Sequence, residues 1–194
     1  MAYPTSVKAN GKIYKLNTDF RIAIKCNKIS QDTTITDIEK TLAIIYLLYG
    51  DEGLDDAENY DELLRLGVKF LCCGNMPNKE QKEPDMDYIQ DEKYIKSSFK
   101  YDYQYDPYKL DYLHWWEFFN DLNNLSNSEM GDCCILNRVR NLRNYDTTKI
   151  KDATERAKIE KAKKEVALKK NLKTDFTEKE RKNNEEFYKL IERK

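Results

Sequence analysis

The single histidine of this 194-residue chain, His114, is the first candidate for acid–base chemistry. An imidazole changes its charge near neutral pH, so it can act as a general base or bind a metal. His114 stands beside Tyr112, Trp115 and Trp116, and no carboxylate or cysteine lies at a distinctive spacing from it. We therefore favour a histidine packed at the edge of an aromatic core, and we predict no catalytic residue.

Four of the five cysteines form two adjacent pairs, Cys72-Cys73 and Cys133-Cys134, which together could supply a four-thiolate zinc site. Zinc-binding thiols usually stand roughly two to four residues apart, and adjacent thiols do not fit that spacing. Neighbours on one helix also point about 100° apart, which makes a disulfide framework a poor fit. We expect buried, reduced thiols, with no metal and no cofactor.

Nucleotide and calcium sites have no support in the sequence. None of the six glycines belongs to a cluster that follows a predicted strand, as a phosphate-binding loop requires. Acidic residues gather at 51–61 and 80–92, but without the alternating Asp/Asn and Gly pattern of a calcium loop. These patterns predict a solvated acidic surface on a protein that is not an enzyme.

The net charge of −1 conceals two segments of opposite sign. Residues 1–148 carry 18 basic and 25 acidic side chains, whereas residues 149–194 carry 16 basic and 10 acidic ones. Because acidic residues interrupt the basic ones in the second segment, a stripe that follows nucleic-acid phosphates is disfavoured. We predict a helical core domain at 1–148 and a charged helical arm at 149–194. A nucleic-acid-binding module in that arm stays an alternative.

The distribution of apolar residues predicts no contact with a membrane. No run reaches the roughly 18 residues that a spanning helix needs, and the longest apolar stretch is 42–49. The opening residues lack the basic and then apolar order of a signal peptide. We therefore expect a protein of the cytoplasm.

Local signals predict a mainly α fold. The Asn10-Gly11 pair indicates a tight turn between two short strands at 6–9 and 12–16. Capping residues and apolar periodicity predict helices at about 19–29, 37–49, 57–73, 88–101, 111–125, 127–142, 151–170 and 177–192. Two of these helix starts are assigned to the capping pairs Thr36 with Glu39 and Ser126 with Glu129. The predicted fold is a single helical bundle domain with a short N-terminal β-hairpin and a charged C-terminal helical extension.

Inward-facing residues follow from the same periodicity. In the first two helices we expect Phe20, Ile24, Ile38, Leu42, Ile45 and Tyr49 to face the core. The helix at 111–125 has the strongest pattern, with Tyr112, Trp115, Trp116, Phe119 and Leu122 on one side.

We expect only one of the two adjacent tryptophans to lie in the core and the other to lie at its margin. We expect Trp116 to fill the core, which places Trp115, about 100° round the helix, near a groove. A large aromatic side chain at such a margin suits a peptide-binding surface, although core packing alone also explains the pair. The candidate partner-binding residues are Tyr112, His114, Trp115, Trp116, Phe118 and Phe119.

Three blocks of the sequence carry a resemblance. They are an opening block with Pro4-Thr5-Ser6-Val7 and Asn17-Thr18-Asp19-Phe20-Arg21, a central block with Asp87-Tyr88 and Leu113-His114-Trp115-Trp116-Glu117-Phe118, and a closing block from Arg138 to Arg156. Together they resemble the bacteriophage proteins of the gene product fifteen family, over about residues 4–168. The His-Trp-Trp motif is the most specific part of this likeness.

The resemblance implies a role in building phage tails. Members of the family are encoded among tail genes, near the gene for the tape-measure protein, which implies a tail-assembly chaperone. Such a factor would coat the tape-measure protein in the cytoplasm of the bacterial host before tail-tube subunits polymerise round it. The tail-tube protein is a second candidate partner, and self-association stays open. The alternative is a structural component of a phage tail or of a tail-like bacteriocin particle.

Overall fold

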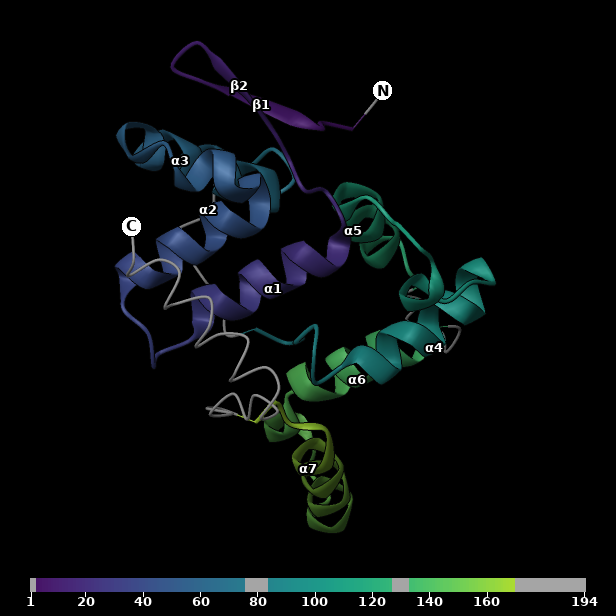
Figure 1. Cartoon of the computed structure of the whole chain (residues 1–194). Coiled ribbons are helices and arrows are strands. Elements are labelled where there is room, and N and C mark those ends of the chain that lie inside the picture. Colours follow the sequence, from purple (N-terminus) through teal and green to yellow (C-terminus); the bar gives the residue numbers. More distant parts are fainter. Residues whose placement is uncertain (1–2, 76–83, 127–132, 170–194) are drawn as a thin grey trace.

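The computed structural model describes residues 3–75, 84–126 and 133–169 of the chain. Within them, a two-stranded hairpin precedes seven α-helices, which confirms the mainly α fold (Figure 1). The elements are β1 (Ser6–Ala9), β2 (Lys12–Lys15), α1 (Phe20–Gln31), α2 (Asp37–Leu54), α3 (Tyr60–Leu71), α4 (Glu92–Tyr103), α5 (Trp115–Asn123), α6 (Ile135–Asn144) and α7 (Ala153–Val166). Single 3-10 turns stand at Ala57–Asn59, Pro107–Lys109 and Thr147–Lys149. The helix predicted at 177–192 lies outside the described residues.

The predicted hairpin is confirmed. Asn10 and Gly11 have φ values of 46° and 92°, as a type I′ turn requires, and Val7 pairs with Tyr14 in the antiparallel register. A two-stranded ribbon needs a supporting surface. The fully buried Tyr14 side chain supplies this contact, because its hydroxyl bonds to Asp56 in the turn between α2 and α3.

Helix α2 begins as predicted but ends later. Thr36 and Glu39 form the capping box, with the Thr36 N–H donating to Glu39 Oε2 at 2.6 Å. The regular helix stops at Gly50 (φ 67°), as the predicted range 37–49 implies, and the chain then makes a further turn to Leu54 that completes α2. Ile38 is 73% exposed, which corrects its assignment to the core. It lies in the first turn of α2, whereas the buried residues of this helix begin at Ala43.

The buried face of α1 consists of Phe20, Ala23 and Cys26, and Ile24 packs against the core although it is only half-buried. A further prediction is corrected in α6. Helix α6 begins at Ile135 after Cys134, so Ser126 does not cap it. The Ser126 N–H and hydroxyl donate instead to the Asp102 carboxylate at the end of α4. Glu129 lies outside the described residues.

The core is built around stacked phenylalanines from three helices. Phe118 of α5 lies between Phe20 of α1 and Phe99 of α4, with ring centroids 4.4 and 5.4 Å apart. All three side chains are fully buried. Aromatic pairs at such distances add about 0.5–1.5 kcal/mol each beyond the burial of their area. This stack holds the N-terminal helices to the central ones.

Helix α7 lies against the body without burying any residue (Figure 1). Polar contacts attach it at its end, where Arg143 Nε of α6 donates to the carbonyl of Val166 at 2.7 Å. Beyond the helix, the Lys169 N–H donates to Gln90 Oε1 at 2.9 Å. The domain division at residue 148 stays a prediction. None of the described helices is long and apolar enough to cross a membrane.

Candidate functional site

His114 is the residue that starts α5. The predicted helix at 111–125 begins only at Trp115, because the His114 imidazole caps it: Nδ1 accepts the N–H of Trp116 at 3.0 Å. Nε2 lies 3.1 Å from the carbonyl of Pro4 and must donate to it, since a carbonyl only accepts. The proton therefore sits on Nε2, and both nitrogens are engaged. These contacts tie His114 to the N-terminal segment and to the first turn of α5.

The two tryptophans bond to the end of another helix. Trp115 Nε1 donates to the carbonyl of Leu71 at 3.0 Å, and Trp116 Nε1 donates to that of Phe70 at 2.9 Å. The last carbonyls of a helix have no partner within it. Both indoles therefore satisfy the C-terminus of α3, where Gly74 (φ 90°) turns the chain away.

The expected roles of the tryptophans are reversed. Trp115 is 3% exposed and Trp116 is half-buried, so Trp116 lies nearer the margin. The reason is the late start of α5, which turns the Trp115 indole beneath the end of α3. Trp116 instead packs on Phe70, with ring centroids 6.2 Å apart, and touches Tyr3 edge-on. Trp115 is buried and lines no groove itself, but it contacts two residues, Tyr88 and Phe119, that line the cavity described below.

The other candidate residues also differ in their burial. Phe118 is fully buried in the phenylalanine stack, whereas Tyr112 is 55% exposed and bonds through its hydroxyl to Thr18 Oγ1 at 2.7 Å. Phe119 is half-buried, and of the six residues it is the one that lines the cavity described next. Of the six residues predicted from the sequence, one therefore lines the cavity and the others do not.

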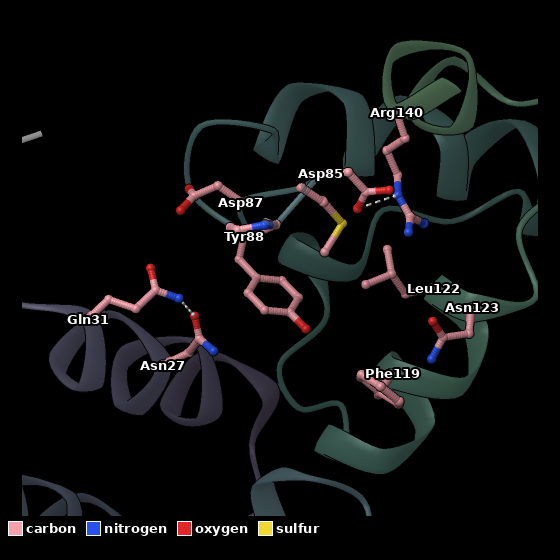
Figure 2. Close-up of a pocket in the computed structure, with 11 residues that line it drawn as sticks. Asn27, Gln31, Asp85, Asp87, Tyr88, Phe119, Leu122, Asn123 and Arg140 are labelled. Atoms are coloured by element: carbon pink, nitrogen blue, oxygen red, sulfur yellow. Dashed lines mark hydrogen bonds and ion pairs between the residues drawn. The ribbon is translucent and has the colours of Figure 1, made fainter. Parts of the chain in front are cut away.

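That cavity of about 220 Å³ lies between α1, residues 84–88, α5 and α6 (Figure 2). We call it the Tyr88 cavity. It is lined by Asn27, Gln31, Pro84, Asp85, Met86, Asp87, Tyr88, Phe119, Leu122, Asn123 and Arg140. Its apolar wall comes from Met86, Tyr88, Phe119 and Leu122, and the amides and charged groups surround them.

The apolar wall is supported from behind by Trp115. The Tyr88 and Phe119 rings, which Figure 2 shows on different sides of the cavity, both contact the Trp115 indole, at centroid distances of 5.8 and 5.5 Å. Burial raises the pKa of the Tyr88 hydroxyl to about 12, so the side chain stays protonated and uncharged near neutral pH. The His-Trp-Trp motif thus positions the cavity without forming its surface.

The segment that carries Tyr88 is a turn where the sequence predicted the start of a helix. Asp87 Oδ1 accepts the N–H groups of Ile89 and Gln90 at 2.9 and 2.7 Å, and α4 begins only at Glu92. Asp and Asn side chains commonly stabilise turns in this way. The turn sets Tyr88 against α5 and leaves the Asp87 carboxylate at the rim.

The rest of the rim is polar and largely paired. Gln31 Nε2 donates to Asn27 Oδ1 at 2.9 Å on α1, and Arg140 Nε lies 3.2 Å from Asp85 Oδ1 across from it (Figure 2). Asn123 completes the rim. Such a site can bind an apolar group and hydrogen-bond to its surroundings. Among the described residues no group of three or more His, Cys, Asp or Glu could hold a metal ion, and all five cysteines are free thiols.

Comparison with known proteins gives one family. A family model described as Bacteriophage Gp15 protein matches residues 2–168. No curated protein and no solved structure matches the chain. The match covers the hairpin, α1 to α7 and every residue of the Tyr88 cavity. The chain therefore belongs to the Bacteriophage Gp15 protein family.

Proposed function

We propose that this protein is a tail-assembly chaperone that holds the tape-measure protein in the host cytoplasm before tail-tube subunits assemble. The observation that carries the proposal is the Tyr88 cavity, an aromatic-lined hollow on the surface of a phage-family protein. Small concave sites with an apolar lining and a few fixed polar groups are typical binding sites. The chain acts here as a binding protein without catalysis.

The size of the cavity fits a transient holder. Burying one large apolar side chain contributes about 1.5–3 kcal/mol, which is too little for tight binding by itself. A long helical partner that exposes many apolar residues can engage several copies of such a site in succession. Each contact is then weak enough for tube subunits to displace it. Weak contacts that can be displaced favour a chaperone over a permanent component of the tail.

Co-expression with the tape-measure protein tests the proposal. The wild-type chain should raise the yield of soluble tape-measure protein and co-purify with it. Phe119→Glu places a charge in the apolar wall and should reduce co-purification about tenfold, the effect of losing about 1.4 kcal/mol. The matched control is Tyr101→Glu, which changes a 65% exposed tyrosine of α4 outside the cavity and should have no effect.

Two outcomes would overturn the proposal: no rescue by the wild-type chain, or equal losses for both variants. The milder Phe119→Ala serves where Phe119→Glu unfolds the chain, as judged by its melting temperature. Mass spectrometry of purified particles tests the alternative of a structural tail component. A chaperone should be absent from finished particles, and its presence at a fixed stoichiometry would favour the alternative.

A further inference from the structure

The volume of the Tyr88 cavity limits what can enter it. An engineered protein cavity of about 150 Å³ binds benzene, so a space of about 220 Å³ takes one aromatic ring with little room for a second. The walls match such a ring, because Tyr88, Phe119 and Leu122 offer aromatic and aliphatic surface. Aromatic rings also pack well against other rings at centroid distances of about 4.5–7 Å.

The charges at the rim are not balanced. Asp85 is paired with Arg140, but in the part of the chain that the structure describes no lysine or arginine forms an ion pair with Asp87. Asp87 is held in place through Oδ1 by the Ile89 and Gln90 N–H groups. The excess of acidic residues in 1–148 has the same sign. The rim therefore favours a cation on whatever fills the cavity.

We propose that the Tyr88 cavity receives a single aromatic side chain from an amphipathic helix of the partner, with a lysine or arginine one turn away that pairs with Asp87. Residues one turn apart lie on the same side of a helix, so one helix can present both groups together. The inference rests on the proposed function, since it specifies which segments of the tape-measure protein are held. The amides of Asn27, Gln31 and Asn123 leave room for polar neighbours on the same helix.

Toluene, followed by NMR on the full chain, probes the cavity without any protein partner. The wild-type chain should show saturable toluene-induced shifts at Phe119 and Leu122. Asn123→Phe places a ring at the rim and should abolish them. Asn120→Phe makes the same change at an exposed position of α5 outside the cavity and should leave them unchanged. No saturable shift in the wild type, or equal shifts in Asn123→Phe, would overturn the proposal.

Two helical peptides of about 20 residues test the charge preference. Both carry a central phenylalanine, and they differ only in a lysine or a glutamate one turn away. The lysine peptide should bind about two- to fivefold more tightly, as expected of an exposed ion pair. Asp87→Asn keeps an oxygen for the Ile89 and Gln90 N–H groups and removes the charge, so it should equalise the two affinities. Equal binding to the wild type, or a preference that persists in Asp87→Asn, would contradict the inference.

These results separate the inference from the function on which it rests. Rescue of the tape-measure protein together with negative toluene and peptide results would support the chaperone function. It would also overturn the inference that an aromatic side chain enters the Tyr88 cavity. Positive toluene and peptide results without rescue would support the binding of an aromatic side chain in the Tyr88 cavity and count against the chaperone function.

Discussion

The Asp91 carboxylate and the Arg143 guanidinium lie face to face, with two N–O distances of 2.7 Å and side chains only 1% and 10% exposed. Arg143 also donates to the carbonyls of Asp85 and Val166. One side chain of α6 therefore joins the start of α4, the end of α7 and the segment that carries Tyr88. The wall of the cavity depends on this ion pair.

Removing one member of that pair should destabilise the fold strongly. Arg143→Met leaves the Asp91 carboxylate buried without its partner, which costs about 3–5 kcal/mol. Urea denaturation measures the change. The matched control is Arg65→Met, which breaks a similarly bidentate but exposed pair with Glu62 and should cost far less. Equal losses for the two variants would show that burial does not set the strength of the pair.

The two tryptophans should differ in what they contribute to stability. Trp115→Phe keeps a ring but leaves the part-buried Leu71 carbonyl without the donor supplied by the buried indole, at a cost of about 1–3 kcal/mol. Trp116→Phe should cost less, because water can reach the margin and replace the bond to Phe70. Thermal unfolding compares the variants. A larger loss for Trp116→Phe would mean that the sequence-based assignment of the core residue was correct.

The thiol of Cys26 should resist modification in the folded chain. Burial raises its pKa to about 12, so only about one molecule in 10⁴ carries a thiolate at pH 8. Cys133 is less buried and should react first with iodoacetamide. Mass spectrometry of labelled peptides distinguishes the two positions. Labelling of both at the same rate without denaturant would contradict the burial of Cys26.

Alkaline conditions should weaken the fold. Burial raises the pKa of Cys26 from about 9 to about 12, and that of Tyr88 from about 10 to about 12. The folded chain holds these protons more tightly than the unfolded chain, so their stabilising contribution is complete below about pH 9. It is lost progressively as pH rises towards 12. Urea midpoints between pH 7 and 11.5 measure this, and a midpoint that stays constant to pH 11.5 would refute it.

Local signals sufficed for much of the fold. Asn10-Gly11 and the Thr36–Glu39 capping box were predicted because each acts through backbone geometry of adjacent residues. Ile38 was assigned wrongly because periodicity identifies an apolar side of a helix but not how much of it is covered. The further turn of α2 after Gly50 was not predicted, because a glycine with positive φ can bend a helix as well as end it.

The candidate site was harder to predict for a physical reason. Its lining combines α1, a turn at 84–88, α5 and α6, and no spacing in the sequence records that they meet. His114 was placed inside a helix because an imidazole cap is less common than a Ser, Thr, Asp or Asn cap. Because the start of the helix was misplaced, Trp115 was predicted to lie at the margin of the core. Phe119 was found because it shares the apolar side of α5, whereas Tyr88 lies in a turn without periodicity.

Hydrogen exchange on the full chain, free and in complex with the tape-measure protein, shows whether the partner binds at the Tyr88 cavity. Binding should slow amide exchange at 27–31, 84–90 and 119–123, the segments round the Tyr88 cavity. Exchange should not change at 38–42, in the first turns of α2, which lie outside the cavity. Protection confined to α2 or to the hairpin, with unchanged exchange round the cavity, would show that the partner does not bind there.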